Sequence, residues 1–124
     1  MSAAPQSLSP SKAARDFLAR RHLLLIGGQW VESADHDEFP VHDPATEMLL
    51  TTVACGGAKD IDRAVAAARA AFNGEWSRLS SHHRSRLIWR LADELEANLD
   101  LAVELEVLDN GMPRSVAHYS IAKF

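Results

Sequence analysis

The sequence predicts an α/β fold in which an N-terminal β-hairpin and short strands precede three to four α-helices. Two observations lead to this fold class. Short extended runs, separated by glycine and proline turns, occupy the chain as far as Gly57. From Asp60 onward, apolar residues recur at steps of three and four residues, which is the spacing of one helix face.

A tight hairpin is predicted at Gly27-Gly28, between the extended runs 23–26 and 29–31. Two adjacent glycines adopt the positive φ angles of a two-residue hairpin turn without steric cost. Further extended runs, residues 39–41 and 48–53, lie on either side of a polar turn at residues 42–46. In that turn proline fixes φ, and the preceding aspartate can accept a hydrogen bond from the backbone two residues on.

The helix predicted over residues 60–72 organises the rest of the chain. Asp60 and Asp62 lie in its first turn, where carboxylates interact favourably with the helix dipole. Asn73-Gly74 ends it, because glycine adopts the left-handed conformation found after helices. Its small, alanine-rich face is expected to sit close against a neighbouring element, and consists of Ile61, Ala64, Val65, Ala68, Ala71 and Phe72.

Three more helices are expected. Ser80 is a plausible N-cap for the first of these, and the second runs from near Asp100 to Asn110-Gly111. The last begins at Arg114 and is cut off in this sequence at Phe124. The residues expected to face inward are Leu87, Ile88, Leu91, Ala92 and Leu95 in the helix after Ser80, and Leu101, Leu105 and Leu108 in the next.

The composition of the chain argues against several classes of protein. The 124 residues suffice for one domain, and the net charge of −4 gives no support for nucleic-acid binding. The single cysteine, Cys55, excludes an internal disulfide and a multi-cysteine metal site, which suits a reducing compartment such as the cytoplasm. The longest apolar run in the hairpin, residues 23–26, is far too short to span a membrane.

The first 20 residues form a separate segment. They are rich in serine and basic residues, with Asp16 as the one acid. We interpret them as a polar arm with a short amphipathic helix around residues 13–20. The alternative is a mitochondrial presequence, which shares this composition.

No residue pattern points to a catalytic site. Cys55 lacks the sequence surroundings of a nucleophile, although it precedes a helix by a few residues. His82 and His83 are adjacent on a helix, so their side chains point about 100° apart and cannot easily share a metal ion. The carboxylates after Leu91 are best interpreted as a solvated helix face. We therefore assign no catalytic and no cofactor-binding residue.

Several stretches nevertheless occur in an order and spacing that resemble the N-terminal segment of the NAD(P)-dependent aldehyde dehydrogenase superfamily. The resemblance covers residues 23–113. Each stretch is weak evidence alone, but their order and spacing together are strong evidence. The stretches are Ile-Gly-Gly-Gln-Trp-Val at 26–31, Phe-Pro-Val-His-Asp-Pro-Ala-Thr at 39–46, the helix at 60–72, Trp-Ser-Arg-Leu-Ser at 76–80 and Leu-Glu-Val-Leu-Asp-Asn-Gly-Met-Pro at 105–113.

The resemblance implies that residues 21–124 are part of a Rossmann-type domain, interrupted in the fourth helix. Full-length members oxidise an aldehyde to a carboxylic acid with NAD or NADP, and their catalytic and cofactor residues would lie outside this sequence. The fragment is then expected to be inactive, to bind neither cofactor well, and to form homo-oligomers or join a complementing chain. The alternative is a non-catalytic helical module or remnant that binds another subunit.

The resemblance also implies a possible monovalent cation site. Its ligands here would be the side chain of Asp109 and the backbone carbonyl of His42. The simpler interpretation, which we favour, is that Asp109 caps or turns the chain. Two departures from the family pattern matter for the backbone: Glu47 stands where glycine is usual, so a left-handed turn there would be strained, and Ala58 replaces the usual helix N-cap.

Overall fold

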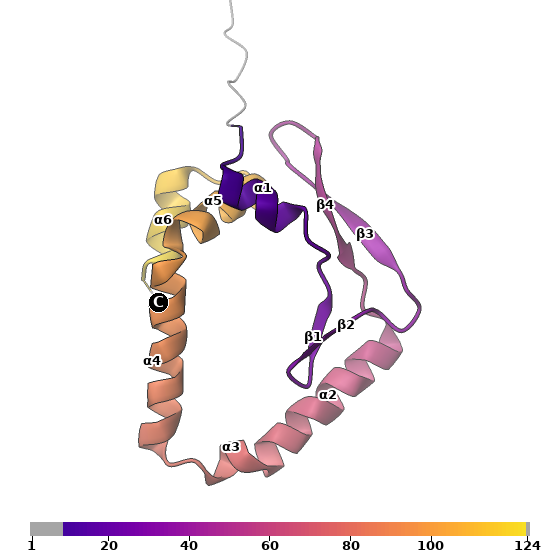
Figure 1. Cartoon of the computed structure of the whole chain (residues 1–124), viewed down its shortest axis with the longest axis vertical. Coiled ribbons are helices and arrows are strands. Elements are labelled where there is room, and N and C mark those ends of the chain that lie inside the picture. Colours follow the sequence, from indigo (N-terminus) through magenta and orange to yellow (C-terminus); the bar gives the residue numbers. More distant parts are fainter. Residues whose placement is uncertain (1–8, 124) are drawn as a thin grey trace, which may run out of the picture. The chain divides into compact units, whose positions relative to one another are not determined.

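A computed structural model describes residues 9–123 (Figure 1). These residues divide into two compact units. One unit combines the chain up to Arg20 with Val41–Thr51 and with the chain from Asn98 onward. The other combines Arg21–Pro40 with Thr52–Ala97. The predicted α/β class, with strands before the main helices, is confirmed.

The first unit contains the apolar core of the described residues. Its helices are α1 (Lys12–Leu18), α5 (Leu99–Asn110) and α6 (Arg114–Ile121). Ser11 caps α1 by accepting a hydrogen bond from the amide of Ala14 at 3.1 Å, so the short helix expected in the leader is present. Residues 1–8 of the predicted arm lie outside the described part of the chain. The buried apolar side chains are Ala14, Val103, Leu108 and Ala117.

The second unit begins with the predicted hairpin. Strands β1 (Leu24–Ile26) and β2 (Gln29–Val31) pair antiparallel, with Leu24 opposite Val31. Gly27 and Gly28 have φ angles of 61° and 78°. These are the left-handed values that the glycine pair was expected to supply.

Strands β3 (Glu38–His42) and β4 (Leu49–Ala54) form a second two-stranded sheet around the predicted polar turn. The Asp43 carboxylate accepts hydrogen bonds from the amide of Ala45 and the hydroxyl of Thr46, both at 2.8 Å. Glu47 has φ 61°, which is the strained left-handed conformation predicted for this position.

Helix α2 (Ala58–Asn73) packs through a different face from the one predicted. Of the six apolar residues expected to pack, Ile61, Val65 and Phe72 are more than half exposed. The side that packs instead carries Asp60, which is buried, and Ala67, whose Cβ lies 3.8 Å from a Cβ built on Gly27. The reason is that the loop after the hairpin offers the backbone amide of Ala34, which favours a carboxylate, and the hairpin offers Gly27, which favours alanine over larger side chains.

The remaining helices begin and end close to the predicted positions. Helix α3 (Glu75–Arg78) was not predicted, whereas α4 (Ser81–Ala97) follows the expected N-cap, Ser80. In α5, Leu108 is buried, and Gly111 ends the helix with φ 73°. None of the 17 residues of α4 is buried, so the face predicted to point inward is exposed in the described chain.

Candidate functional site

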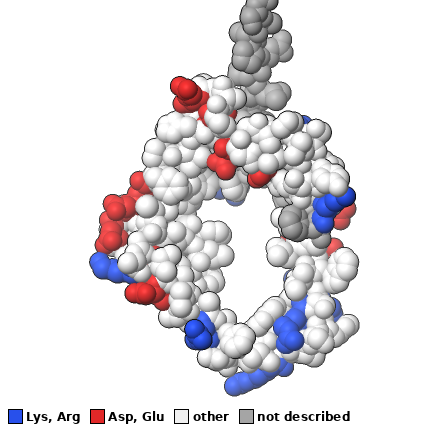
Figure 2. All heavy atoms as spheres, turned by 180° about the vertical axis from the view of Figure 1, so that it is seen from behind, with Lys and Arg blue, Asp and Glu red and all other residues white. Residues whose placement is uncertain are grey.

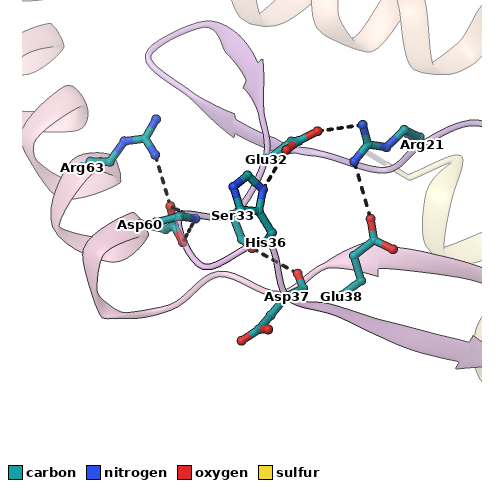
Figure 3. A network of polar contacts seen from close by, with 9 residues as sticks. Arg21, Glu32, Ser33, His36, Asp37, Glu38, Asp60 and Arg63 are labelled. Carbon is teal, nitrogen blue, oxygen red and sulfur yellow. Dashed lines mark hydrogen bonds and ion pairs between the residues drawn. The ribbon is translucent and has the colours of Figure 1, made fainter.

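One polar cluster of the second unit is centred on Asp60 (Figure 3). Asp60 is the third residue of α2 and only 2% exposed. Its two carboxylate oxygens lie 3.2 and 3.1 Å from the amide nitrogen of Ala34. It also accepts from the amide of Gly57 at 3.1 Å and lies 3.3 Å from the Arg63 guanidinium. The hydrogen bond from Ala34 and then that from Gly57 lower the pKa of Asp60, against the opposing effect of burial.

A second polar cluster lies on the loop after β2. Arg21 donates to Glu32 at 2.7 Å and lies 3.7 Å from Glu38, while the His36 ring contacts Glu32 at 2.8 Å. Hydrogen bonds from Arg21 and from His36 lower the pKa of Glu32. Beside it, the buried Ser33 hydroxyl donates to the carbonyl of Asp37 at 3.1 Å. Figure 3 shows the side chains of Arg21, Glu32 and Glu38 pointing toward one another.

Both clusters connect backbone segments and leave no activated group. Each carboxylate is held as an anion by donors, so neither is poised as a general base near neutral pH. A nucleophile beside a base is also lacking in these clusters. Both are structural contacts: the Asp60 cluster holds the loop after β2 against the start of α2, and the second cluster joins Arg21 to Glu32 and Glu38. Sequence reasoning missed the tie between Asp60 and Ala34, although an acid three residues after a helix N-cap is a recognisable capping signal.

An open groove of about 470 Å³ lies in the first unit. Its walls are mainly apolar, with Leu18, Leu50 and Leu108 among them. The polar side chains that line it are engaged elsewhere: Asp43 accepts from the turn, and Arg15 donates to the carbonyl of Pro10. The groove therefore offers apolar surface but no reactive group.

The two residues predicted as cation ligands lie on segments that the first unit brings together. A Cβ built on Gly111 would lie only 3.0 Å from Cγ of Pro44, so the end of α5 packs against the polar turn. Asp109 is exposed in the last turn of α5, and His42 ends β3. Among residues 9–123, no group of three or more His, Cys, Asp or Glu side chains could hold a metal ion.

The other residues considered for a chemical role do not form a site together. Cys55 is exposed, and its backbone amide donates to the carbonyl of Asp37 at 2.7 Å. The rings of His82 and His83 lie 6.0 Å apart. His83 sits at the start of α4, as expected, with its ring 3.2 Å from the Ser80 hydroxyl.

The charge distribution and the hydropathy are two further features of the described residues. On the face shown in Figure 2, Lys and Arg side chains form small separate groups and no broad basic surface. Within the described residues, no helix is both long enough and apolar enough to cross a membrane.

Comparison with known proteins identifies the chain's family. The profile of the Aldehyde dehydrogenase family matches residues 30–124. Aldehyde dehydrogenase 1 of Tanacetum cinerariifolium is 46% identical over 97 residues, which cover 77% of this chain and 19% of that protein. Human mitochondrial aldehyde dehydrogenase is 38% identical over 97 residues, again 77% and 19% of the two chains. The NAD+ complex of the Bacillus cereus aldehyde dehydrogenase superimposes with a TM-score of 0.85 at 35% identity, covering 90% of this chain and 23% of that one.

The chain therefore belongs to the aldehyde dehydrogenase family, as the sequence resemblance indicated. It matches the N-terminal part of the family's structures and spans about a fifth of the length of the relatives it matches. The relatives are aldehyde dehydrogenases, and one was solved with NAD+ bound.

Proposed function

We propose that this chain is the N-terminal structural segment of an NAD(P)-dependent aldehyde dehydrogenase and carries none of its catalytic groups. The observation that supports this most is the imbalance in burial. Sixteen large apolar side chains of the described residues are exposed, whereas only four apolar residues are buried. A surface of this kind is expected where further protein covers it.

The reaction proposed for the whole enzyme is oxidation of an aldehyde to a carboxylic acid. The aldehyde carbon gains an oxygen from water, its hydride passes to NAD or NADP, and a proton is released. The aldehyde, the cofactor, the nucleophile and the base would all be bound or provided by other segments of the family fold. This segment would contribute the hairpin, the sheet and the helices that pack around the cofactor-binding domain, with residues 1–20 as an arm and 21–124 as the family segment.

The test is complementation. The purified chain, mixed with NAD+ or NADP+ and an aldehyde, is expected to produce no reduced nicotinamide. Adding a second chain that carries the remaining family segments is expected to restore activity. Val65→Asp, on the exposed face of α2, should weaken restoration, while Asp62→Asn in the same helix should not. Activity of the chain alone that disappears in Cys55→Ala would instead establish an independent enzyme.

A second candidate function is a non-catalytic helical module that binds another subunit. It is favoured by α4, which has no buried residue and therefore presents its whole surface to a partner. The two functions differ in the protein that associates with the chain. Stable binding to a chain unrelated to aldehyde dehydrogenases, without any restored activity, would favour the module.

For the monovalent cation, we propose Asp109 and the His42 carbonyl as partial ligands, with the remaining ligands from other segments. The proximity of Gly111 to Pro44 supports this pairing of segments. Sodium or potassium should raise the melting temperature of the complemented protein, and Asp109→Ala should abolish that increase. A rise that persists in Asp109→Ala would leave Asp109 as a helix-end residue only.

We propose a cytoplasmic location, because a single exposed thiol suits a reducing compartment. Human and other relatives are mitochondrial by name, so the leader is the segment to test. A reporter fused to residues 1–25 is expected to stay in the cytoplasm, and its import into an organelle would overturn the proposal.

A further inference from the structure

The chain contains two Asn-Gly pairs, each at the end of a helix. Asn73-Gly74 ends α2, and Asn110-Gly111 ends α5. Asn-Gly is the dipeptide most prone to deamidation, because glycine has no side chain to hinder attack by its backbone nitrogen on the preceding side-chain amide. Both pairs share this reactivity as dipeptides, so a difference between them must come from their surroundings in the fold.

The Asn110 side chain is held at both of its polar atoms. Its Nδ2 donates to the carboxylate of Glu106 at 2.6 Å, and its Oδ1 accepts from the amide of Met112 at 2.9 Å. The attacking nitrogen is engaged as well, because the Gly111 amide donates to the carbonyl of Val107 at 3.0 Å. Attack on Cγ of Asn110 would break or distort these hydrogen bonds, and the fold therefore opposes the reaction at this pair.

Asn73 lacks this protection. Its side chain is exposed and has no hydrogen-bond partner within residues 9–123. The Gly74 amide donates to the carbonyl of Ala71 at 3.2 Å, in the last turn of α2. Helix ends open more readily than helix interiors, so the attacking nitrogen and the side-chain amide can meet whenever this last turn opens.

The fold also requires glycine at position 74. A Cβ built on Gly74 would lie 2.8 Å from the backbone oxygen of Ala70, which is closer than a real Cβ approaches. The φ angle of Gly74 is −98°, so the left-handed conformation expected from the sequence is not the reason for glycine here. The reason is the space at the junction of α2 and α3. A bulkier residue, which would slow deamidation, does not fit there without a shift of the backbone.

We propose that Asn73 is a site of spontaneous deamidation in the folded chain and that Asn110 is protected by its hydrogen bonds. The Gly74 nitrogen loses its proton to hydroxide and forms a bond to Cγ of Asn73. The bond from Cγ to Nδ2 then breaks, and the leaving nitrogen takes a proton from water and departs as ammonia. Water opens the resulting cyclic imide at Cγ, which gives aspartate, or at the backbone carbonyl carbon of Asn73, which gives isoaspartate.

Either product weakens the end of α2. Aspartate places a negative charge at the helix C-terminus, where the helix dipole disfavours it, and the last turn of α2 has no basic residue to offset that charge. Isoaspartate also inserts a methylene group into the backbone at the junction with α3. This inference goes beyond the aldehyde dehydrogenase assignment and is read out as peptide mass, so either proposal can fail while the other stands.

The first experiment compares the two asparagines within one sample of the full, folded chain. After incubation in mildly alkaline buffer, trypsin separates them into peptides 70–78 and 91–114, and mass spectrometry with fragmentation locates each new carboxylate. A sample digested without incubation gives the background. Conversion of Asn73 is expected to be at least about fivefold faster than that of Asn110, because more hydrogen bonds must break at Asn110. Equal rates, or faster conversion of Asn110, would overturn the proposal.

Denaturant tests whether the fold causes the difference. In concentrated urea both pairs lose their native surroundings, so their rates should agree within about twofold. A difference that persists unchanged in urea would mean that local sequence and not the fold sets the rates, and it would overturn the proposed protection.

Two variants test the residues named. Asn73→Gln should abolish the new carboxylate in peptide 70–78, because glutamine would have to form a larger ring. Glu106→Ala removes the acceptor of the Asn110 amide and should speed conversion of Asn110 several-fold in the folded chain. Glu96→Ala removes a carboxylate from α4 and is the matched control, expected to leave that rate unchanged. An unchanged rate at Asn110 in Glu106→Ala would contradict protection by this hydrogen bond.

Discussion

The carboxylate of Asp60 binds the backbone amide of Ala34, 26 residues earlier in the chain, with its two oxygens 3.1 and 3.2 Å from that nitrogen. The same carboxylate caps its own helix through Gly57. One buried side chain thus fixes both the start of α2 and the position of the loop after β2. The second unit has no buried apolar residue among those described, so this tie carries an unusual share of its order.

Replacing Asp60 with asparagine is expected to destabilise the second unit. The amide keeps one acceptor oxygen but turns an NH2 group toward backbone donors, and it loses the charge that faces Arg63. The melting temperature should fall by several degrees. Asp62→Asn is the control, because Asp62 is an exposed residue of the same helical turn. An equal effect of both variants would show that only the helix dipole is involved.

The Asp60 tie should also make stability depend on pH. Because the pKa of Asp60 is lower in the folded chain than in the unfolded chain, its contribution is complete above the unfolded pKa. That contribution is lost as the pH falls through the folded pKa, because protonation then removes the acceptor. Chemical denaturation of the original chain should therefore show a falling midpoint below about pH 4. The fall should be smaller in Asp60→Asn, and an identical slope in both proteins would contradict this assignment.

Local signals made the elements predictable. The glycine pair fixed the hairpin, Ser80 the start of α4, and Gly111 the end of α5, because each acts through the backbone of its own few residues. The packed side of α2 was not predictable from periodicity. Apolar spacing predicts which face is covered, but the side of α2 that packs in this chain is set by the hairpin and the loop after it, where Ala67 lies near Gly27 and Asp60 binds the amide of Ala34.

The candidate site could likewise be predicted only in part from the sequence. No catalytic or cofactor-binding residue could be predicted from the residue types, whereas the resemblance to the family could be inferred from motif order. The approach of Gly111 to Pro44 could not, because it joins segments distant in sequence through backbone shape. It is the strongest structural support for placing Asp109 near the polar turn.

Gly111→Ala is expected to destabilise the first unit through two effects. A side chain at φ 73° costs about 1–2 kcal/mol, and its Cβ would lie 3.0 Å from Cγ of Pro44. Gly28→Ala is the matched comparison, because φ is 78° there and nothing lies within 4 Å of the built Cβ. Chemical denaturation should show a larger loss for Gly111→Ala. Pro44→Ala should recover part of it in the double variant, and strictly additive losses would mean that the two residues do not interact.

Ser80→Ala is expected to weaken α4. The Ser80 hydroxyl accepts from the amide of His83 at 3.3 Å, and loss of such a cap typically costs about 1 kcal/mol. Circular dichroism should report a smaller helical signal and a lower melting temperature. Ser81→Ala, the first residue inside the helix, is the control and should leave both nearly unchanged. A loss confined to Ser81→Ala would place the cap one residue later.

Glu47→Gly is expected to stabilise the chain, which is the reverse of the usual effect of introducing glycine. Glu47 holds φ 61°, where a residue with a Cβ pays about 1–2 kcal/mol, while glycine loses about 0.5–1 kcal/mol more backbone entropy on folding. The difference leaves a net gain of about 0–1.5 kcal/mol from relieving the strain, and the midpoints of the two ranges give about 0.75 kcal/mol. The gain should appear in chemical denaturation as a higher midpoint with an unchanged slope. Glu75→Gly is the contrasting variant, because Glu75 lies in helix α3 and should lose stability on the same substitution. Lower stability of Glu47→Gly would mean that the side chain of Glu47 contributes more than its backbone strain costs.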